Sequence, residues 1–101
     1  MLGLWVLTRV EDHKRQELIQ SLSAFIPEPS MRPSRRFILE DVNDESLVAW
    51  LGYWRSDGEL DEFLASPTFQ AMKGAADTLG HLEEVRQLNG RLLHPIETSR
   101  P

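Results

Sequence analysis

A mostly apolar run near the middle of the chain, residues 47–55 (LVAWLGYWR), limits the possible folds more than any other segment. Its β-branched and aromatic residues are typical of a strand. Successive side chains of a strand point to opposite faces, and here neither face is polar. A chain of 101 residues can cover one of these faces with its own helices. We therefore expect the other face to contact a second subunit, a ligand or both.

Patterns on both sides of this run predict the remaining elements of a single domain. Residues 2–10, 35–42 and 82–93 have the composition of strands. Apolar residues at helical spacing predict a helix over residues 13–26 with Asp12 as its N-cap. They also predict two successive helical segments, capped by Ser56 and Ser66 and ending at Gly80. The resulting order, β-α-β-β-α-β with an antiparallel sheet, is the ferredoxin-like α+β fold. We expect this domain to span residues 1–96, with a polar tail over 97–101.

Charge and composition exclude several classes of function. The formal net charge is −5, whereas nucleic-acid binding requires a basic surplus to neutralise phosphates. We interpret the basic cluster Arg32, Arg35 and Arg36 as solvated charges at the start of a strand. There is no cysteine, and the three histidines have no metal-ligand spacing, so we expect no metal site. No apolar run approaches the ~20 residues of a membrane span, and no signal peptide is recognisable. We expect a cytoplasmic protein stabilised by oligomerisation.

Three stretches, in this order, resemble the antibiotic biosynthesis monooxygenase (ABM) superfamily: residues 37–44 (FILEDVND), 51–56 (LGYWRS) and 60–69 (LDEFLASPTF). In that family a strand ending in Trp-x-Ser leads to a helix with an apolar residue and then to a Ser-x-x-Phe-like helix start. The resemblance extends over nearly all of the chain. It implies a dimeric α+β barrel in which each chain has a cavity between its sheet and its helices. Members include cofactor-independent monooxygenases, haem-degrading enzymes and isomerases of small phosphorylated sugars.

Departures from the family pattern narrow the possible activities. The haem-degrading branch has Asn, Trp and His at the positions occupied here by Thr8, Phe63 and Lys73. We therefore reject haem degradation. Gly52 stands where the family often has Glu, which implies less polar chemistry and more room in that part of the site.

The resemblance implies a monooxygenase that needs no cofactor and acts on a small aromatic or quinol-like molecule. Such chemistry requires an electron-rich substrate, a dry pocket and a few orienting groups. The alternative is a non-enzymatic small-molecule-binding or regulatory dimer on the same fold, since few ionisable groups lie at the expected site. A purely structural dimer without a ligand is a third possibility. Under each hypothesis we expect a homodimer and no nucleic acid or membrane partner.

Six side chains are candidates for substrate binding: Trp54, Arg36, Glu40, Arg86, Phe63 and His94. The Trp54 indole could stack on a flat substrate or simply fill the core. Arg36 and Glu40 are four residues apart on one strand and hence on one face. They could orient an oxyanion or a phenol, or form a solvated charge pair.

The remaining candidates have other possible roles. Arg86 could hold an anion, and His94 could act as a base near neutral pH. Trp50 and Trp5 are candidates for the dimer interface or for the sheet core. No residue can be named as catalytic, because no nucleophile-base set, carboxylate pair or phosphate loop is recognisable.

Overall fold

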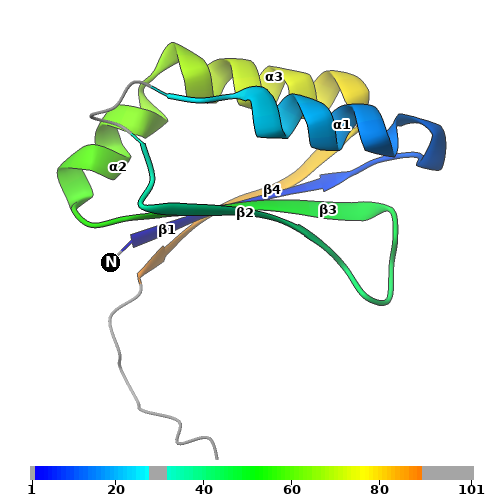
Figure 1. Ribbon diagram of the computed structural model, residues 1–101, viewed down its shortest axis with the longest axis horizontal. Coiled ribbons are helices and arrows are strands. Elements are labelled where there is room, and N and C mark those ends of the chain that lie inside the picture. The colour runs from blue at the N-terminus through cyan, green and yellow to red at the C-terminus, as the bar shows by residue number, and fades with distance from the viewer. Residues whose placement is uncertain (1, 28–31, 90–101) are drawn as a thin grey trace, which may run out of the picture.

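The chain forms one antiparallel sheet and three helices in the computed structural model, which describes residues 2–27 and 32–89 (Figure 1). The elements are β1 (Leu2–Arg9), α1 (Asp12–Ala24), β2 (Arg35–Glu40), β3 (Leu47–Trp54), α2 (Asp57–Leu64), α3 (Pro67–Leu79) and β4 (His81–Asn89). This is the predicted order with the second helix divided in two, and it confirms the ferredoxin-like α+β fold. No helix in the described ranges is long and apolar enough to cross a membrane.

The four strands are arranged in the order β2-β3-β1-β4, and each neighbouring pair is antiparallel. The apolar strand β3 is therefore central, between β1 and β2. Val6 lies opposite Trp50, and Trp5 lies opposite Leu51. All three helices pack on one side of this sheet (Figure 1). Within the described part of the chain, no helix covers the other side, which we call the uncovered face.

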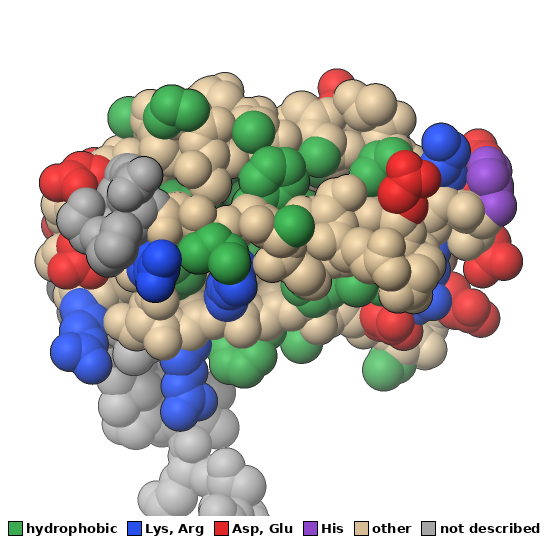
Figure 2. All heavy atoms as spheres, turned by 45° about the horizontal axis from the view of Figure 1, so that its top comes forward, with side chains coloured by type: hydrophobic (Ala, Val, Ile, Leu, Met, Phe, Trp, Pro, Cys, Tyr) green, Lys and Arg blue, Asp and Glu red, His purple; other side chains and the backbone are tan. Residues whose placement is uncertain are grey.

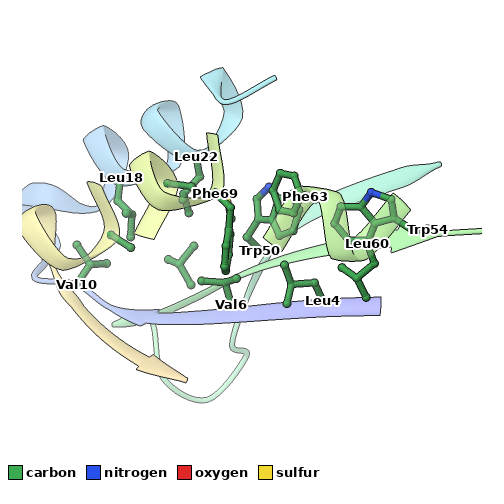
Figure 3. Packing of buried hydrophobic residues seen from close by; sticks show 13 residues of the cluster. Leu4, Val6, Val10, Leu18, Leu22, Trp50, Trp54, Leu60, Phe63 and Phe69 are labelled. Atoms are coloured by element: carbon green, nitrogen blue, oxygen red, sulfur yellow. The ribbon is translucent and has the colours of Figure 1, made fainter. Parts of the chain in front are cut away.

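The core lies between the helices and the sheet (Figure 3). From the sheet it includes Leu4, Val6, Trp50 and Trp54, and each helix adds apolar side chains to it. The helical contribution consists of Leu18 and Leu22 from α1, Leu60 and Phe63 from α2, and Phe69, Met72 and Ala76 from α3. The predicted helical stripes thus face the sheet, as amphipathic packing requires.

The helix starts confirm two of the three predicted caps. The Ser56 and Ser66 hydroxyls each accept a hydrogen bond from the backbone N–H three residues later, at 3.3 and 3.1 Å. The prediction for Asp12 is wrong. Glu11 occupies the cap position without a side-chain cap bond, and Asp12 is the first residue of α1. Its carboxylate there still interacts favourably with the helix dipole.

The turn between β2 and β3 begins earlier than predicted. The strand was expected to reach residue 42, but the carboxylate of Asp41 accepts hydrogen bonds from the backbone N–H groups of Asn43 and Asp44, at 2.8 and 3.0 Å. This Asx-type turn ends β2 at Glu40. Val42, predicted as part of the strand, is 96% exposed. The predicted end of the last strand lies outside the described residues.

A glycine is required where α3 meets the sheet. A Cβ atom at Gly80 would lie 2.3 Å from the backbone oxygen of Arg9. Any side chain at this position would push the end of α3 away from β1. Gly80, predicted to end the second helical region, therefore also allows the helix layer to approach the sheet closely.

Candidate functional site

The structure assigns each face of β3 to one environment. Val48, Trp50, Gly52 and Trp54 point toward the helices and are buried. The alternate residues of β3 belong to the uncovered face; they are Leu47, Ala49, Leu51 and Tyr53. A cavity between sheet and helices is therefore bounded by the Trp50 side of the strand.

Two of the predicted substrate contacts, Trp54 and Phe63, belong to a closed aromatic cluster. Their ring centroids are 5.0 Å apart, and Phe63 also stacks on Trp50 at 5.9 Å and contacts Phe69 at 5.3 Å (Figure 3). The Trp54 side chain has no exposed surface. A flat ligand could reach Trp54 or Phe63 only by displacing one of these rings. The structure thus favours the core-filling alternative for Trp54 over substrate stacking.

Gly52 makes this cluster possible, and its role differs from the one expected. A Cβ atom at Gly52 would lie 2.7 Å from the Trp50 ring and 3.1 Å from the Trp54 ring. The two indoles therefore occupy the volume above the glycine. The expected extra room in the site is absent because these rings fill it.

A cavity of about 280 Å³ opens next to this cluster, between α1 and β2. Its lining consists of Leu22, Ser23, Arg36, Phe37, Ile38 and Trp50. We call it the aromatic cavity, because the Trp50 indole forms part of its wall. Its volume is close to the lower end of the ~300–1,000 Å³ typical of small-molecule sites. Arg36 is the ionisable residue in this lining, so the cavity combines apolar side chains and the Ser23 hydroxyl with a single cation.

Arg36 and Glu40 lie on the same face of β2, as predicted, but they do not act on one site. The Arg36 guanidinium donates from Nη1 to the backbone oxygen of Phe25, at 3.0 Å. This bond connects β2 to the end of α1 and holds Arg36 at the cavity. Glu40 instead forms an ion pair with Arg15, at 2.5 Å, and does not line the aromatic cavity.

The other predicted site residues lie elsewhere. Arg86 is opposite Trp5 and so lies on the uncovered face, where it pairs with Glu84 at 2.7 Å. It is therefore separated from the aromatic cavity by the sheet. The predicted interface role of Trp50 does not fit the structure, because its indole is under the helices and only 2% exposed. Trp5 lies on the uncovered face, as an interface residue would. His94 lies outside the described residues.

Four lining residues, Leu22, Ser23, Phe37 and Ile38, were not predicted as site residues from the sequence. Leu22 belonged to the predicted helical stripe, but nothing in the sequence indicated which strand that stripe would cover. The position of Trp50 had a usable signal. Trp50 and Trp54 are four apart on one strand and must share a face, so they could not have been assigned separately to the interface and to the substrate.

A second hollow, of about 590 Å³, lies at the other end of the sheet, near the start of α1 and the end of α3. Its lining includes Arg9 but no Trp, Tyr or Phe. Arg9 is already neutralised by Glu83 at 2.9 Å and Asp44 at 3.3 Å. Hydrogen bonds from Ser46 and the contact with Arg9 hold the pKa of Asp44 below its ordinary value of 3.8. Because this hollow has no aromatic wall and its arginine is already paired, it is a weaker candidate for an aromatic ligand, although Lys14 also lines it.

The described ranges contain no group of three or more His, Asp or Glu residues arranged to hold a metal ion.

Comparison with solved structures shows where this fold occurs. A putative antibiotic biosynthesis monooxygenase from Chloroflexus aurantiacus is 20% identical with a TM-score of 0.68, and the match covers 95% of this chain and 98% of that one. A putative antibiotic biosynthesis monooxygenase from Deinococcus radiodurans is 14% identical with a TM-score of 0.74, and the match covers 99% of this chain and 100% of that one. SnoaB, a cofactor-independent oxygenase from Streptomyces nogalater, is 16% identical with a TM-score of 0.65, and the match covers 94% of this chain and 96% of that one.

At these identities the similarity establishes the fold. The chain has the ferredoxin-like fold of ABM proteins over nearly its whole length, which supports the resemblance seen in the sequence. No family model matches the sequence, and no curated protein matches it.

Proposed function

We propose that this protein is a cofactor-independent monooxygenase of the ABM type, which binds a small aromatic or quinol-like molecule in the aromatic cavity. The observation that carries the proposal is the wall of that cavity, where the Trp50 indole, Leu22 and Ile38 lie beside one arginine. An aromatic ring in the cavity can contact the small accessible part of this indole, which also stacks on Phe63. The fold shared with SnoaB, described as a cofactor-independent oxygenase, supports the reaction class.

Oxygen chemistry of this class does not need a protein-bound redox group. When a substrate methylene is oxidised to a carbonyl, it supplies four electrons, which reduce O₂ to the product oxygen and one water. The protein contributes binding, exclusion of water and stabilisation of the anionic form of the substrate. The Arg36 guanidinium would lower the pKa of a bound phenol and so increase the fraction of the electron-rich phenolate.

Oxygen uptake with a panel of naphthohydroquinones and anthrones tests the proposal. The wild-type rate should exceed the buffer rate, and Ser23→Trp should lower kcat/KM at least about tenfold, because the larger side chain fills the cavity. Ser23→Ala is the matched control. It removes only the hydroxyl, which donates to the backbone oxygen of Ile19, and should retain activity. Uptake no faster than in buffer across the panel would count decisively against a monooxygenase.

The same experiment distinguishes the alternative. If a panel compound binds to wild type but not to Ser23→Trp, and remains chemically unchanged, the protein is a binding or regulatory module. The small number of ionisable groups at the cavity is the feature that favours this outcome.

We further propose that the protein works as a homodimer in which a second copy covers the uncovered face. Phe37, Leu39 and Leu88 on that face are 39, 41 and 37% exposed. Soluble monomers rarely expose contiguous apolar patches larger than a few hundred Å². Arg86 and Glu84 provide both charge signs beside this apolar area, which suits contact between two identical surfaces. Sedimentation at micromolar concentration should give a dimer, and a monomer would refute this assembly.

A further inference from the structure

The arginines of the described residues fall into two groups. Arg9, Arg15 and Arg86 each have a carboxylate within ion-pair distance. In the described part of the chain, Arg32, Arg35, Arg36 and Arg55 have none. This is unexpected in a protein with sixteen acidic and eleven basic residues. Positive charge without an internal partner therefore collects where β2 begins and β3 ends, and blue side chains gather at one side of the surface in Figure 2.

Three of these arginines line a hollow of about 340 Å³, which we call the arginine pocket. Its lining consists of Ile26, Pro27, Arg32, Pro33, Ser34, Arg35 and Arg36. Arg36 also lines the aromatic cavity, so the two hollows adjoin each other at this side chain. A ligand in the aromatic cavity would have to pass Arg36 to reach the arginine pocket.

Backbone contacts fix two of the guanidinium groups in place. Arg32 donates from Nε to the backbone oxygen of Pro27, at 3.0 Å, and Arg36 donates from Nη1 to that of Phe25, also at 3.0 Å. Each bond uses one nitrogen and leaves further N–H groups that can donate to a ligand. Because these side chains are held in position before binding, less conformational entropy is lost when an anion arrives.

Resting on the proposed function, we propose that the natural ligand is an aromatic carboxylate. Its ring occupies the aromatic cavity against Trp50, and its carboxylate lies in the arginine pocket, where Arg32 and Arg36 donate hydrogen bonds to it. A planar guanidinium matches a carboxylate with two parallel hydrogen bonds. Arg35 adds charge at the same pocket. The acidic helix α2 begins just after β3, at the same end of the sheet (Figure 1). Its negative charge offsets the long-range attraction of the arginines for an anion. Direct hydrogen bonds therefore provide the selectivity for a carboxylate.

Isothermal titration with a pair of matched compounds tests this proposal. Naphthalene-2-carboxylate and naphthalene-2-carboxamide have the same shape but differ in charge. The carboxylate should bind about tenfold more tightly to the wild type, the range expected for a charge-assisted hydrogen-bonded pair. Arg32→Gln and Arg36→Gln should each remove most of that difference while leaving amide binding within about twofold.

Two controls separate direct contact from a general charge effect. Lys14→Gln removes one positive charge at the far end of the molecule, beside the second hollow, and should leave the preference for the carboxylate unchanged. Arg32→Lys keeps the positive charge but loses the planar guanidinium with its paired N–H donors. It should recover only part of the preference for the carboxylate over the amide. Circular dichroism of each variant confirms that the fold is retained.

Three results would overturn the inference: equal affinity for both compounds, an unchanged preference in Arg32→Gln and Arg36→Gln, or no binding of either compound. Each of these can occur while oxygen uptake with neutral quinols still supports a monooxygenase. Conversely, selective carboxylate binding without any oxygen uptake would support this ligand class and refute the monooxygenase. The two proposals therefore fail independently.

Discussion

The two faces of the sheet are both apolar, but they are stabilised in different ways. On the helix side, Trp50 and Trp54 are enclosed by α2 and α3 within one chain. On the other side, Trp5 and Leu39 have no helix above them in the described part of the chain. The comparison shows that apolarity on a strand predicts contact but not the partner. The first face depends on intramolecular packing, and we propose that the second depends on another copy.

The largest expected difference between the faces comes from one substitution made on each. Trp54→Ala should destabilise the protein by about 3–5 kcal/mol, because it leaves a cavity in a closed core. Trp5→Ala should cost clearly less in the protomer, since no helix packs on that indole. Urea unfolding at low protein concentration, where association contributes least, measures both. If both variants lost the same free energy of unfolding, the uncovered face would contribute as much to the stability of one chain as the core does.

A charge on the uncovered face should separate association from folding. Leu39→Glu would place an unpaired carboxylate in the proposed interface and should raise the dimer dissociation constant at least ~100-fold. Val42→Glu, on the exposed turn next to β2, is the matched control and should leave the dimer intact. Sedimentation gives the oligomeric state, and circular dichroism confirms folding. An intact dimer of Leu39→Glu would exclude this face as the interface.

A pair of glycine substitutions tests how tightly the helix side is packed. Gly52→Ala should destabilise by about 1–3 kcal/mol, because its methyl group would overlap the Trp50 ring. Gly74→Ala, in the exposed middle of α3 where a Cβ meets nothing within 4 Å, should instead stabilise by about 0.5–1 kcal/mol. Thermal unfolding measures both. If Gly52→Ala were neutral, the indoles could move aside, and the cluster would be less rigid than the structure indicates.

The smallest expected effect lies outside both faces, in the turn after β2. The pKa of Asp44 is below 3.8 in the folded protein, so its carboxylate contributes stability above that pH. This contribution is lost as the pH falls through the lower, folded pKa. Asp44→Asn should therefore be slightly less stable than wild type at pH 7, and the two should converge as the pH falls below the folded pKa of Asp44. A difference that does not change with pH would assign the effect to the turn geometry and not to the charge.

The fold was largely predictable because each element depends on local chemistry. The apolar periodicity of α1 and α3, the serine caps at 56 and 66, and the run forming β3 are all evident in the sequence. The errors were also local. The Asp41 carboxylate ends β2 through hydrogen bonds to the following backbone, and this chemistry was not recognised in advance.

The candidate site was much less predictable, because it depends on which elements become neighbours. Arg36 was identified, but its contact with the end of α1 depends on how that helix crosses β2. Arg86 lies on the opposite face of the sheet from the aromatic cavity, so it cannot hold an anion in that cavity. Strand parity alone could not decide which face the helices would cover, because both faces of β3 are apolar. Only the tertiary arrangement determines this.

The three tryptophans of the chain lie in three different environments, and this gives the protein natural optical probes. Trp54 is enclosed in the aromatic cluster, so its emission should respond mainly to unfolding. Trp50 borders the aromatic cavity and should respond to an occupant. Trp5, on the uncovered face, should shift its emission when a second copy excludes water. Variants in which two of the three tryptophans are replaced by Phe would each keep one emitter, and would therefore allow folding, ligand binding and association to be followed separately by fluorescence without an added dye.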